Sequence, residues 1–192
     1  MTSWVIGFDL SLTAPAAVAL PLDWRPGDWR HVKTWLTRPT PPRQDDLRGQ
    51  LERYRIIADW ALKAIEQATG VKGAPGHYLT ECAVESYAFS KNNAQASKLM
   101  ELGGVVRMAL FETMGILPIT VSTSSARKLL LGNVPKEAPK IAVQTMLFKA
   151  KAPKTWEENI CDAMCVCNFA LSEAGGVALA TAPRPKAKRR KS

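Results

Sequence analysis

Three short strand-like segments open the chain, the first two of them apolar, and turn-forming residues separate them. They cover Trp4–Phe8, which ends at Asp9, then Ala14–Leu20 and His31–Thr37. Pro, Gly and Asp between residues 21 and 28 turn the chain between the last two segments. Successive strands joined by short turns are typical of an antiparallel meander. The pattern therefore predicts a three-stranded meander at the start of the domain.

Farther along, strand-like and helix-like apolar patterns alternate. Two further strands are expected at Tyr78–Glu85 and Leu117–Ser122. Helices are indicated where apolar side chains recur every three or four residues: from a capping Asp45 or Asp46 to about Ala68, then Ala94–Met114, Ser124–Leu131, Pro139 to about Lys149, and Trp156–Glu173. Helical crossovers join parallel strands. This order predicts an α/β fold whose mixed five-stranded sheet is flanked by helices.

The helix expected over Ala94–Met114 is apolar on more than one side. One stripe follows the helical period: Leu99, Leu102, Val106 and Leu110. A second apolar group lies off that stripe: Met100, Met108 and Phe111. Either the helix is sandwiched within the domain, or one of its faces meets a second subunit.

Net charge narrows the possible functions. The 192 residues carry 26 Lys and Arg against 17 Asp and Glu, which leaves a formal net charge of +9. This excess favours a polyanionic partner, and nucleic acid is the commonest one. The length fits one domain, expected over residues 1–182. Residues 183–192 are rich in Lys, Arg and Pro and are expected to form a disordered basic tail.

The cysteines do not form the pattern of a disulfide framework. Three of them fall close together on the last expected helix, at positions that cannot all pair, and their spacing lacks the C-x2-C knuckle of a zinc site: Cys82, Cys161, Cys165 and Cys167. A zinc site is the alternative to thiols that pack as small hydrophobes. We expect buried thiols and a reducing cytoplasm. No apolar run reaches the length of a membrane span, and no secretion signal is apparent.

Three acidic residues could converge at one edge of the predicted sheet. Asp9 ends the first strand, Glu85 ends the strand after the first long helix, and Asp162 lies on an apolar face of the last helix. Open α/β folds place their sites at such an edge. Carboxylates gathered there repel one another, and Mg²⁺ or Mn²⁺ would relieve the repulsion. Each acid also has a structural alternative, as a turn cap, a lysine partner or a partly buried helix residue.

Two neighbours share the side of the last helix on which Asp162 lies. Glu158 is about 40° away around the helix and Asn159 about 60°. Glu157 is about 140° away and is expected to face solvent. Asp162 itself needs a cation or hydrogen-bond donor, because a carboxylate on an apolar face is unstable without one.

The sequences around these acids resemble those of RuvC-type Holliday junction resolvases, in the same order along the chain. Four blocks carry the resemblance: Ile6-Gly7-Phe8-Asp9-Leu10-Ser11; Ala83-Val84-Glu85-Ser86-Tyr87-Ala88-Phe89-Ser90-Lys91-Asn92; Ser125-Ala126-Arg127-Lys128 followed by Lys140; and Asn159-Ile160-Cys161-Asp162-Ala163. Bacterial members usually show Pro-Gly in place of Leu10-Ser11 and often carry an acid in place of Asn159. These departures are typical of a divergent, phage-like branch.

The resemblance implies a ribonuclease H-like fold and a homodimer, acting in DNA recombination and repair in a bacterial or phage-infected cell. It implies hydrolysis of four-way DNA junctions with two Mg²⁺ ions per active site, for which Mn²⁺ would substitute. The cut would leave a 5′-phosphate and a 3′-hydroxyl. Carried over by position, the metal ligands are Asp9, Glu85 and Asp162, with Glu158 or the carbonyl oxygen of Asn159 as the fourth.

Other residues carried over from the resemblance would act on the DNA. Lys128 and Lys140 would stabilise phosphate charge as catalytic cations beside the four carboxylates. The expected DNA contacts are Tyr87, Phe89, Lys91, Asn92, Arg127, Lys128, Arg184, Lys186, Lys188, Arg189 and Arg190. The structural alternatives are surface solubility for the two lysines, core packing for the aromatic residues and a solvated terminus for the tail.

Three rival functions fit parts of the pattern. A flap, fork or general branched-DNA nuclease would share the fold. A junction-binding protein without catalysis would have lost its fourth ligand at Asn159. An actin- or sugar-kinase-like ATPase also begins with an Asp-bearing strand, but it needs glycine-rich phosphate loops and greater length, which this sequence lacks.

Overall fold

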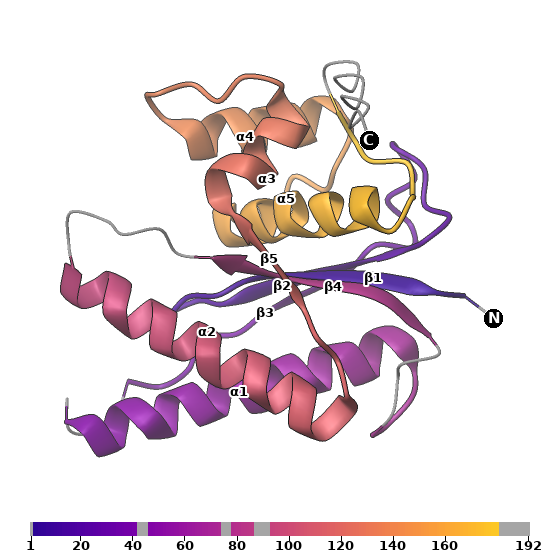
Figure 1. The fold of residues 1–192 in the computed structure, drawn as a ribbon. Helices are drawn as coiled ribbons and strands as arrows, with labels where there is room; N and C mark the ends of the chain where they lie inside the picture. The colour runs from indigo at the N-terminus through magenta and orange to yellow at the C-terminus, as the bar shows by residue number, and fades with distance from the viewer. Residues whose placement is uncertain (1, 42–45, 74–77, 87–92, 181–192) are drawn as a thin grey trace, which may run out of the picture.

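The chain folds into a five-stranded sheet with helices on both faces (Figure 1). The computed structural model describes residues 2–41, 46–73, 78–86 and 93–180. The strands are β1 (Trp4–Asp9), β2 (Ala16–Pro21), β3 (Lys33–Leu36), β4 (Leu79–Ser86) and β5 (Ile119–Ser122). They lie in the order β3-β2-β1-β4-β5, so β1 is the central strand.

The strand directions confirm the predicted mixed sheet. β1 pairs with β2, and β2 with β3, in antiparallel fashion, as expected for a meander. β1 pairs with β4, and β4 with β5, in parallel fashion. A long helix precedes each of the last two strands and provides the crossover that parallel neighbours require.

The helices cover both faces of the sheet. In the described ranges they are α1 (Leu47–Thr69), α2 (Asn93–Met114), α3 (Thr123–Leu131), α4 (Pro139–Lys149) and α5 (Glu158–Glu173). α1 and α2 lie on one face, and α3, α4 and α5 lie on the other (Figure 1). None of these helices is both long enough and apolar enough to cross a membrane.

Capping residues explain where two of the helices begin. Asp46 caps α1 by accepting a hydrogen bond from the backbone N–H of Gly49 at 2.8 Å. Ser122 caps α3 by accepting one from the N–H of Ser125 at 3.1 Å. At the other end of α1, Gly70 adopts φ 75°, a left-handed conformation that glycine tolerates best. Each side-chain cap stabilises its helix by about 1 kcal/mol.

The last helix begins later than predicted. We expected Trp156–Glu173, whereas α5 starts at Glu158. The N–H of Trp156 instead bonds back to the carbonyl oxygen of Pro153 at 3.1 Å. The indole packs edge-on against Trp29, with 5.5 Å between ring centroids. Tertiary packing thus holds Trp156 outside the helix.

Alternation along β1 divides its side chains between two cores. Val5 packs into the core on the α5 side of the sheet. Ile6 and Phe8 pack into the core formed with α1 and α2. Because successive side chains of a strand point to opposite faces, Gly7 and Asp9 face α5, as Val5 does.

α5 lies so close to β1 that only glycine fits at position 7. A Cβ built on Gly7 would lie 2.5 Å from Cα of Cys167 and 2.7 Å from the carbonyl carbon of Val166. Both are backbone atoms, which cannot rotate away as the end of a side chain can. The contact therefore sets the distance between α5 and the end of β1.

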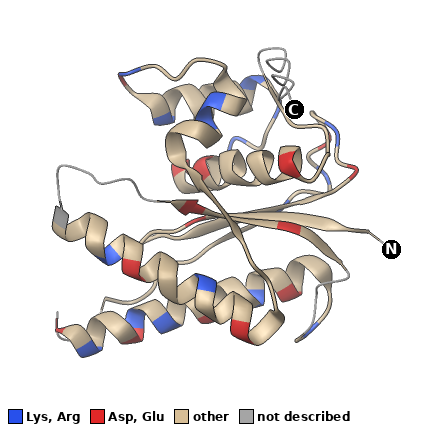
Figure 2. Cartoon of the chain, viewed as in Figure 1, with Lys and Arg blue, Asp and Glu red and all other residues tan. Residues whose placement is uncertain are grey.

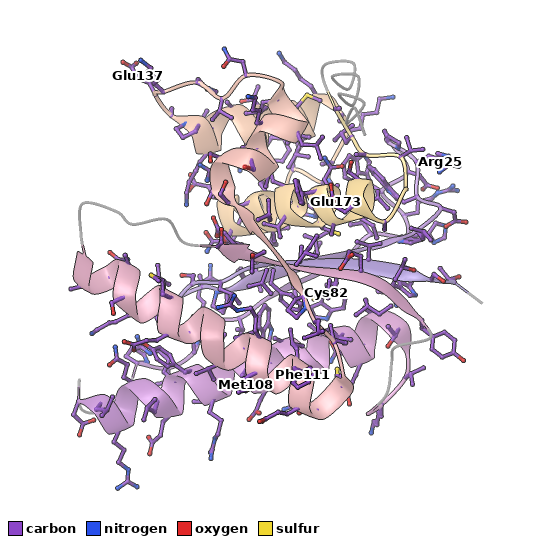
Figure 3. All side chains as sticks on the ribbon, viewed as in Figure 1. Arg25, Cys82, Met108, Phe111, Glu137 and Glu173 are labelled. Carbon is purple, nitrogen blue, oxygen red and sulfur yellow. The ribbon has the colours of Figure 1, made fainter. Side chains whose placement is uncertain are left out.

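One face of α2 is exposed. Leu102, Val106 and Leu110 are buried against the sheet and α1, as the predicted stripe requires. Met108 and Phe111 lie on the other side of the helix and are 57% and 51% exposed (Figure 3). The described residues therefore do not sandwich α2 on both sides, and the alternative of a second subunit stays open.

The cysteines are buried free thiols, as predicted. Burial raises the pKa of the Cys161 thiol to about 12. A thiol with a raised pKa stays protonated and is a poor metal ligand, which disfavours the zinc alternative. The cytoplasmic location inferred from these cysteines stays a prediction.

Replacing Gly7 by alanine is expected to destabilise the protein by about 3 kcal/mol, because the new methyl group would overlap the backbone of α5. Urea denaturation measures the effect. Gly103→Ala on α2 is the control, since its new methyl group meets no atom within 4 Å. That change should stabilise α2 by about 0.5–1 kcal/mol. Equal stability of Gly7→Ala and wild type would contradict the close approach of α5.

Candidate active site

The ends of β1 and β4 place two acidic side chains next to each other. The parallel register pairs Phe8 with Val84, so Asp9 and Glu85 are the next residues along the two strands. Both are buried and lie on the sheet face that packs against α5. Their carboxyl groups lie within hydrogen-bonding reach of each other. The two acids therefore converge as the sequence predicts.

α5 adds a third acid from above the sheet. This helix runs antiparallel to β1 (Figure 1), with the backbone of Cys167 against Gly7. Two residues onward along β1 advance about 6.6 Å, and five residues back along α5 advance about 7.5 Å. Asp162 therefore comes to lie near Asp9. Figure 2 shows acidic positions at the end of β4 and the start of α5 on the same side of the molecule.

Burial is the main reason why the Asp9–Glu85 pair holds its protons more tightly than usual. Burial raises the pKa of Asp9 well above its ordinary value, and the hydrogen bond and charge of Glu85 raise it further. Burial also raises the pKa of Glu85, and the charge of Asp162 adds to this effect. The positive charge of Lys140 acts against this effect and lowers the pKa of both carboxyls. Neighbouring buried carboxyls share protons unless a cation is present.

Asp162 is neutralised in a different way. Its Oδ1 accepts hydrogen bonds from Nε and Nη2 of Arg127 at 3.0 and 2.9 Å, and its Oδ2 accepts one from Nη2 at 2.8 Å. The two side chains are only 12% and 7% exposed. Nζ of Lys140 lies 3.8 Å from Oδ2 as a second cation. Asp162 thus meets the cation that a buried carboxylate requires.

The residues beside Asp162 on α5 have separate roles. Glu158 is exposed, and its Oε2 lies 3.7 Å from Nζ of Lys140. Asn159 donates a hydrogen bond from its amide nitrogen to the carbonyl oxygen of Ala14 at 2.7 Å, which ties α5 to the connection between β1 and β2. Glu157 is exposed, as predicted. Neither predicted fourth ligand touches Asp9 or Glu85 through a hydrogen bond seen in the described residues.

Of the two adjacent basic residues on α3, the structure brings Arg127 to the acids. Lys128 is exposed and takes part in none of the ion pairs between described residues. Lys140, at the start of α4, reaches the acids as the resemblance implies. Two cations from different helices therefore cover the acidic cluster, and the catalytic role of Lys128 stays a prediction.

Most of the predicted DNA contacts fall on parts of the chain that the structure does not describe. These residues are Tyr87, Phe89, Lys91, Asn92, Arg184, Lys186, Lys188, Arg189 and Arg190. Their roles, and that of the basic tail as a whole, stay predictions.

Carboxylate oxygens are the ligands that Mg²⁺ and Mn²⁺ prefer, and Asp9 and Glu85 fit such an ion. They are buried, in contact, and outside every ion pair between described residues. Asp162 fits less well, because Arg127 engages both of its oxygens. In the described parts of the chain, no three His, Cys, Asp or Glu side chains are placed to hold one ion. The geometry suits an ion on the Asp9–Glu85 pair more than one shared by all three acids.

Thr123, the first residue of α3, is a site residue that was not predicted from the sequence. Its hydroxyl donates a hydrogen bond to Oε1 of Glu85. The available signal was its position directly after β5, whose last residues pair with the end of β4 at Glu85 and Ser86. A hydroxyl at that point lies within reach of the neighbouring strand end.

Asp9→Asn is expected to remove a pH-dependent loss of stability in the metal-free protein. Because the folded pKa of Asp9 is raised, the folded state keeps a proton that the unfolded chain releases. The free energy of unfolding therefore falls as pH rises from the ordinary Asp pKa through the folded pKa. Asparagine does not ionise, so the variant should be more stable than wild type on the alkaline side of that range.

Thermal denaturation in EDTA from about pH 5 to about pH 9 measures this slope. Asp59→Asn, at an exposed position on α1, is the matched control and should keep the wild-type slope. Parallel stability curves for Asp9→Asn and wild type would show that Asp9 does not hold the shifted proton.

Comparison with known proteins agrees with this fold. No protein-family model and no curated protein matches the sequence. The structure of Thermus thermophilus RuvC matches with a TM-score of 0.60 and 19% identity, over 90% of this chain and 97% of that chain. T. thermophilus RuvC in complex with a Holliday junction substrate matches with a TM-score of 0.58 and 19% identity, over 90% of this chain and 92% of that one. The chain therefore has the ribonuclease H-like fold of RuvC, as the sequence predicts.

Proposed function

We propose that this chain is a Mg²⁺-dependent endodeoxyribonuclease that cuts four-way DNA junctions. The proposal rests on the contact between the buried carboxyls of Asp9 and Glu85, beside Asp162, at the edge of a RuvC-type sheet. The T. thermophilus RuvC of similar fold was solved with a Holliday junction substrate, which supports branched DNA as the substrate here. The net charge of +9 supports the same class of partner.

Each group at the site has a proposed task. Asp9 and Glu85 would hold a divalent ion, and Asp162 with Glu158 or Asn159 would supply ligands for a second. Bound Mg²⁺ supplies an activated water and neutralises charge on the phosphate. The cut would leave a 5′-phosphate and a 3′-hydroxyl. The cationic side chains over the acids would bind and orient the scissile phosphate.

A homodimer would match the approximate two-fold symmetry of a four-way junction, so that two subunits could cut two strands. We place the contact on the exposed face of α2, which carries Met108 and Phe111. Large apolar side chains grouped on one helix face are typical of subunit interfaces.

One observation favours the non-catalytic alternative. Arg127 neutralises Asp162, and Asn159 binds a backbone carbonyl, so the site as it stands resembles a closed ion-pair network. A junction-binding protein without catalysis would keep this arrangement permanently. A flap or general branched-DNA nuclease would differ only in substrate.

Asp9→Asn or Glu85→Gln is expected to lower junction nicking by more than about a hundredfold, because each removes a charged ligand needed in the transition state. Nicking of a labelled four-way junction with Mg²⁺, and with EDTA instead, measures the loss. Junction binding, measured by gel shift, should remain. Asp59→Asn is the control and should nick normally. Full activity in either site variant would refute the assignment.

The same assay separates the alternatives when a flap and a plain duplex are run beside the junction. Preferential cutting of the junction supports the proposed function, and equal cutting of all branched substrates supports the general nuclease. Binding without nicking in either Mg²⁺ or Mn²⁺ would establish the non-catalytic protein.

Phe111→Glu is expected to raise the dissociation constant of the dimer by at least about thirtyfold, since it places a charge in an apolar contact. Size-exclusion chromatography with light scattering measures the molar mass. Leu117→Glu is the matched control, because Leu117 is 75% exposed but follows α2 rather than lying on it. A monomeric wild type, or a Phe111→Glu variant that stays dimeric, would contradict this interface.

A further inference from the structure

The ion pair between Arg127 and Asp162 is the strongest one in the described part of the site. Three hydrogen bonds of 2.8–3.0 Å join the guanidinium to both oxygens of the carboxylate. Bidentate pairs of this kind are the strongest charge-assisted hydrogen bonds in proteins. The Asp9–Glu85 pair, in contrast, makes no ion pair with any described residue.

This ion pair weakens Asp162 as a metal ligand. Oxygen lone pairs engaged by Arg127 are not free for a metal ion, and the positive charge of the guanidinium repels one. A divalent ion that enters the site should therefore meet Asp9 and Glu85 first. Asp162 becomes an equal ligand only when Arg127 moves.

A phosphodiester is a group that can draw Arg127 away. The planar fork of a guanidinium binds phosphate oxygens in the same bidentate manner as a carboxylate. Lys140 remains 3.8 Å from Oδ2 of Asp162, so Asp162 keeps a cationic neighbour if Arg127 turns to the DNA. The exchange does not leave a buried carboxylate unpaired.

We propose that Arg127 is a positioning residue that withholds Asp162 from divalent ions until a DNA phosphate binds its guanidinium. This inference rests on the proposed function, because it assumes DNA and metal at the same site. Metal binding and DNA binding are then coupled through one side chain, and the coupling is reciprocal: DNA tightens metal binding by the factor by which metal tightens DNA binding. The substrate would complete the metal site.

Calorimetric titration with Ca²⁺ tests the coupling without requiring cleavage, because Ca²⁺ binds oxygen ligands. The metal-free full chain is titrated alone and with a four-way junction, and Ca²⁺ binding to the junction alone is subtracted. In wild type, the junction should tighten Ca²⁺ binding by about tenfold or more. In Arg127→Gln, Ca²⁺ should bind about tenfold more tightly without DNA, and the junction should add less than about threefold.

Three further variants test whether Arg127 weakens Ca²⁺ binding by covering the oxygens of Asp162 or only by its positive charge. Arg127→Lys keeps the charge but cannot cover both oxygens, so it should also tighten Ca²⁺ binding; it carries the test if Arg127→Gln does not fold. Lys140→Gln removes a nearby charge without uncovering Asp162 and should have a smaller effect. Arg30→Gln breaks an exposed bidentate pair with Asp28, whose bonds measure 3.0 and 3.2 Å, and should change nothing.

The inference is overturned if both Arg127 variants bind Ca²⁺ as wild type does. It is also overturned if Lys140→Gln tightens binding as much as Arg127→Gln, or if the junction tightens Ca²⁺ binding equally in wild type and Arg127→Gln. These outcomes can be distinguished from a failure of the proposed function. If the protein nicks junctions but shows no coupling, only the proposed role of Arg127 is refuted. If it shows the coupling but never nicks, only the proposed nuclease activity is refuted.

Discussion

The close approach of α5 to β1 is the constraint on which the site depends. At Gly7 the backbones are so near that a single methyl group would overlap Cys167 and Val166. A helix held at this distance over the central strand has little freedom to slide or rotate, because protein interiors are close-packed. Its register against β1 therefore decides which residue of α5 lies near Asp9. The contact between α5 and β1 therefore both requires glycine at position 7 and places Asp162 near Asp9.

The three acids of the site are stabilised in two different ways. Asp9 and Glu85 are buried together, and that burial is the main reason why the pKa of each is raised. Asp162 is paired with the guanidinium of Arg127. The carboxyls of Asp9 and Glu85 therefore leave oxygen ligands available to a divalent ion, whereas the carboxyl of Asp162 is already paired with the cationic side chain of Arg127. A metal ion that enters the site would therefore meet two available carboxyls and one that is paired, and the position of Arg127 determines this difference.

Much of the fold could be predicted from the sequence because local signals and packing agree. The meander, both crossovers and the cap at Asp46 follow from apolar periodicity and turn chemistry. The start of α5 could not be predicted, since Trp156 fits a helical pattern but is held in a turn by its contact with Trp29. That contact joins segments far apart in the chain, and periodicity does not report such contacts. The strand-end acids were predictable for the opposite reason, because strand polarity alone brings Asp9 and Glu85 to one edge.

The choice between Arg127 and Lys128 could not be made from the sequence alone. Adjacent helical residues differ by about 100° in direction, so only one of the two can point at the acids. Ala126 and Leu130 are buried and orient α3, but both basic residues flank that apolar face in the sequence. The deciding factor is the partner: a buried Asp162 on α5 requires a nearby cation, and Arg127 is the one that reaches it. A fold selected for stability alone would gain more from apolar side chains at Asp9 and Glu85. Their burial in contact with each other therefore supports the proposed divalent ion.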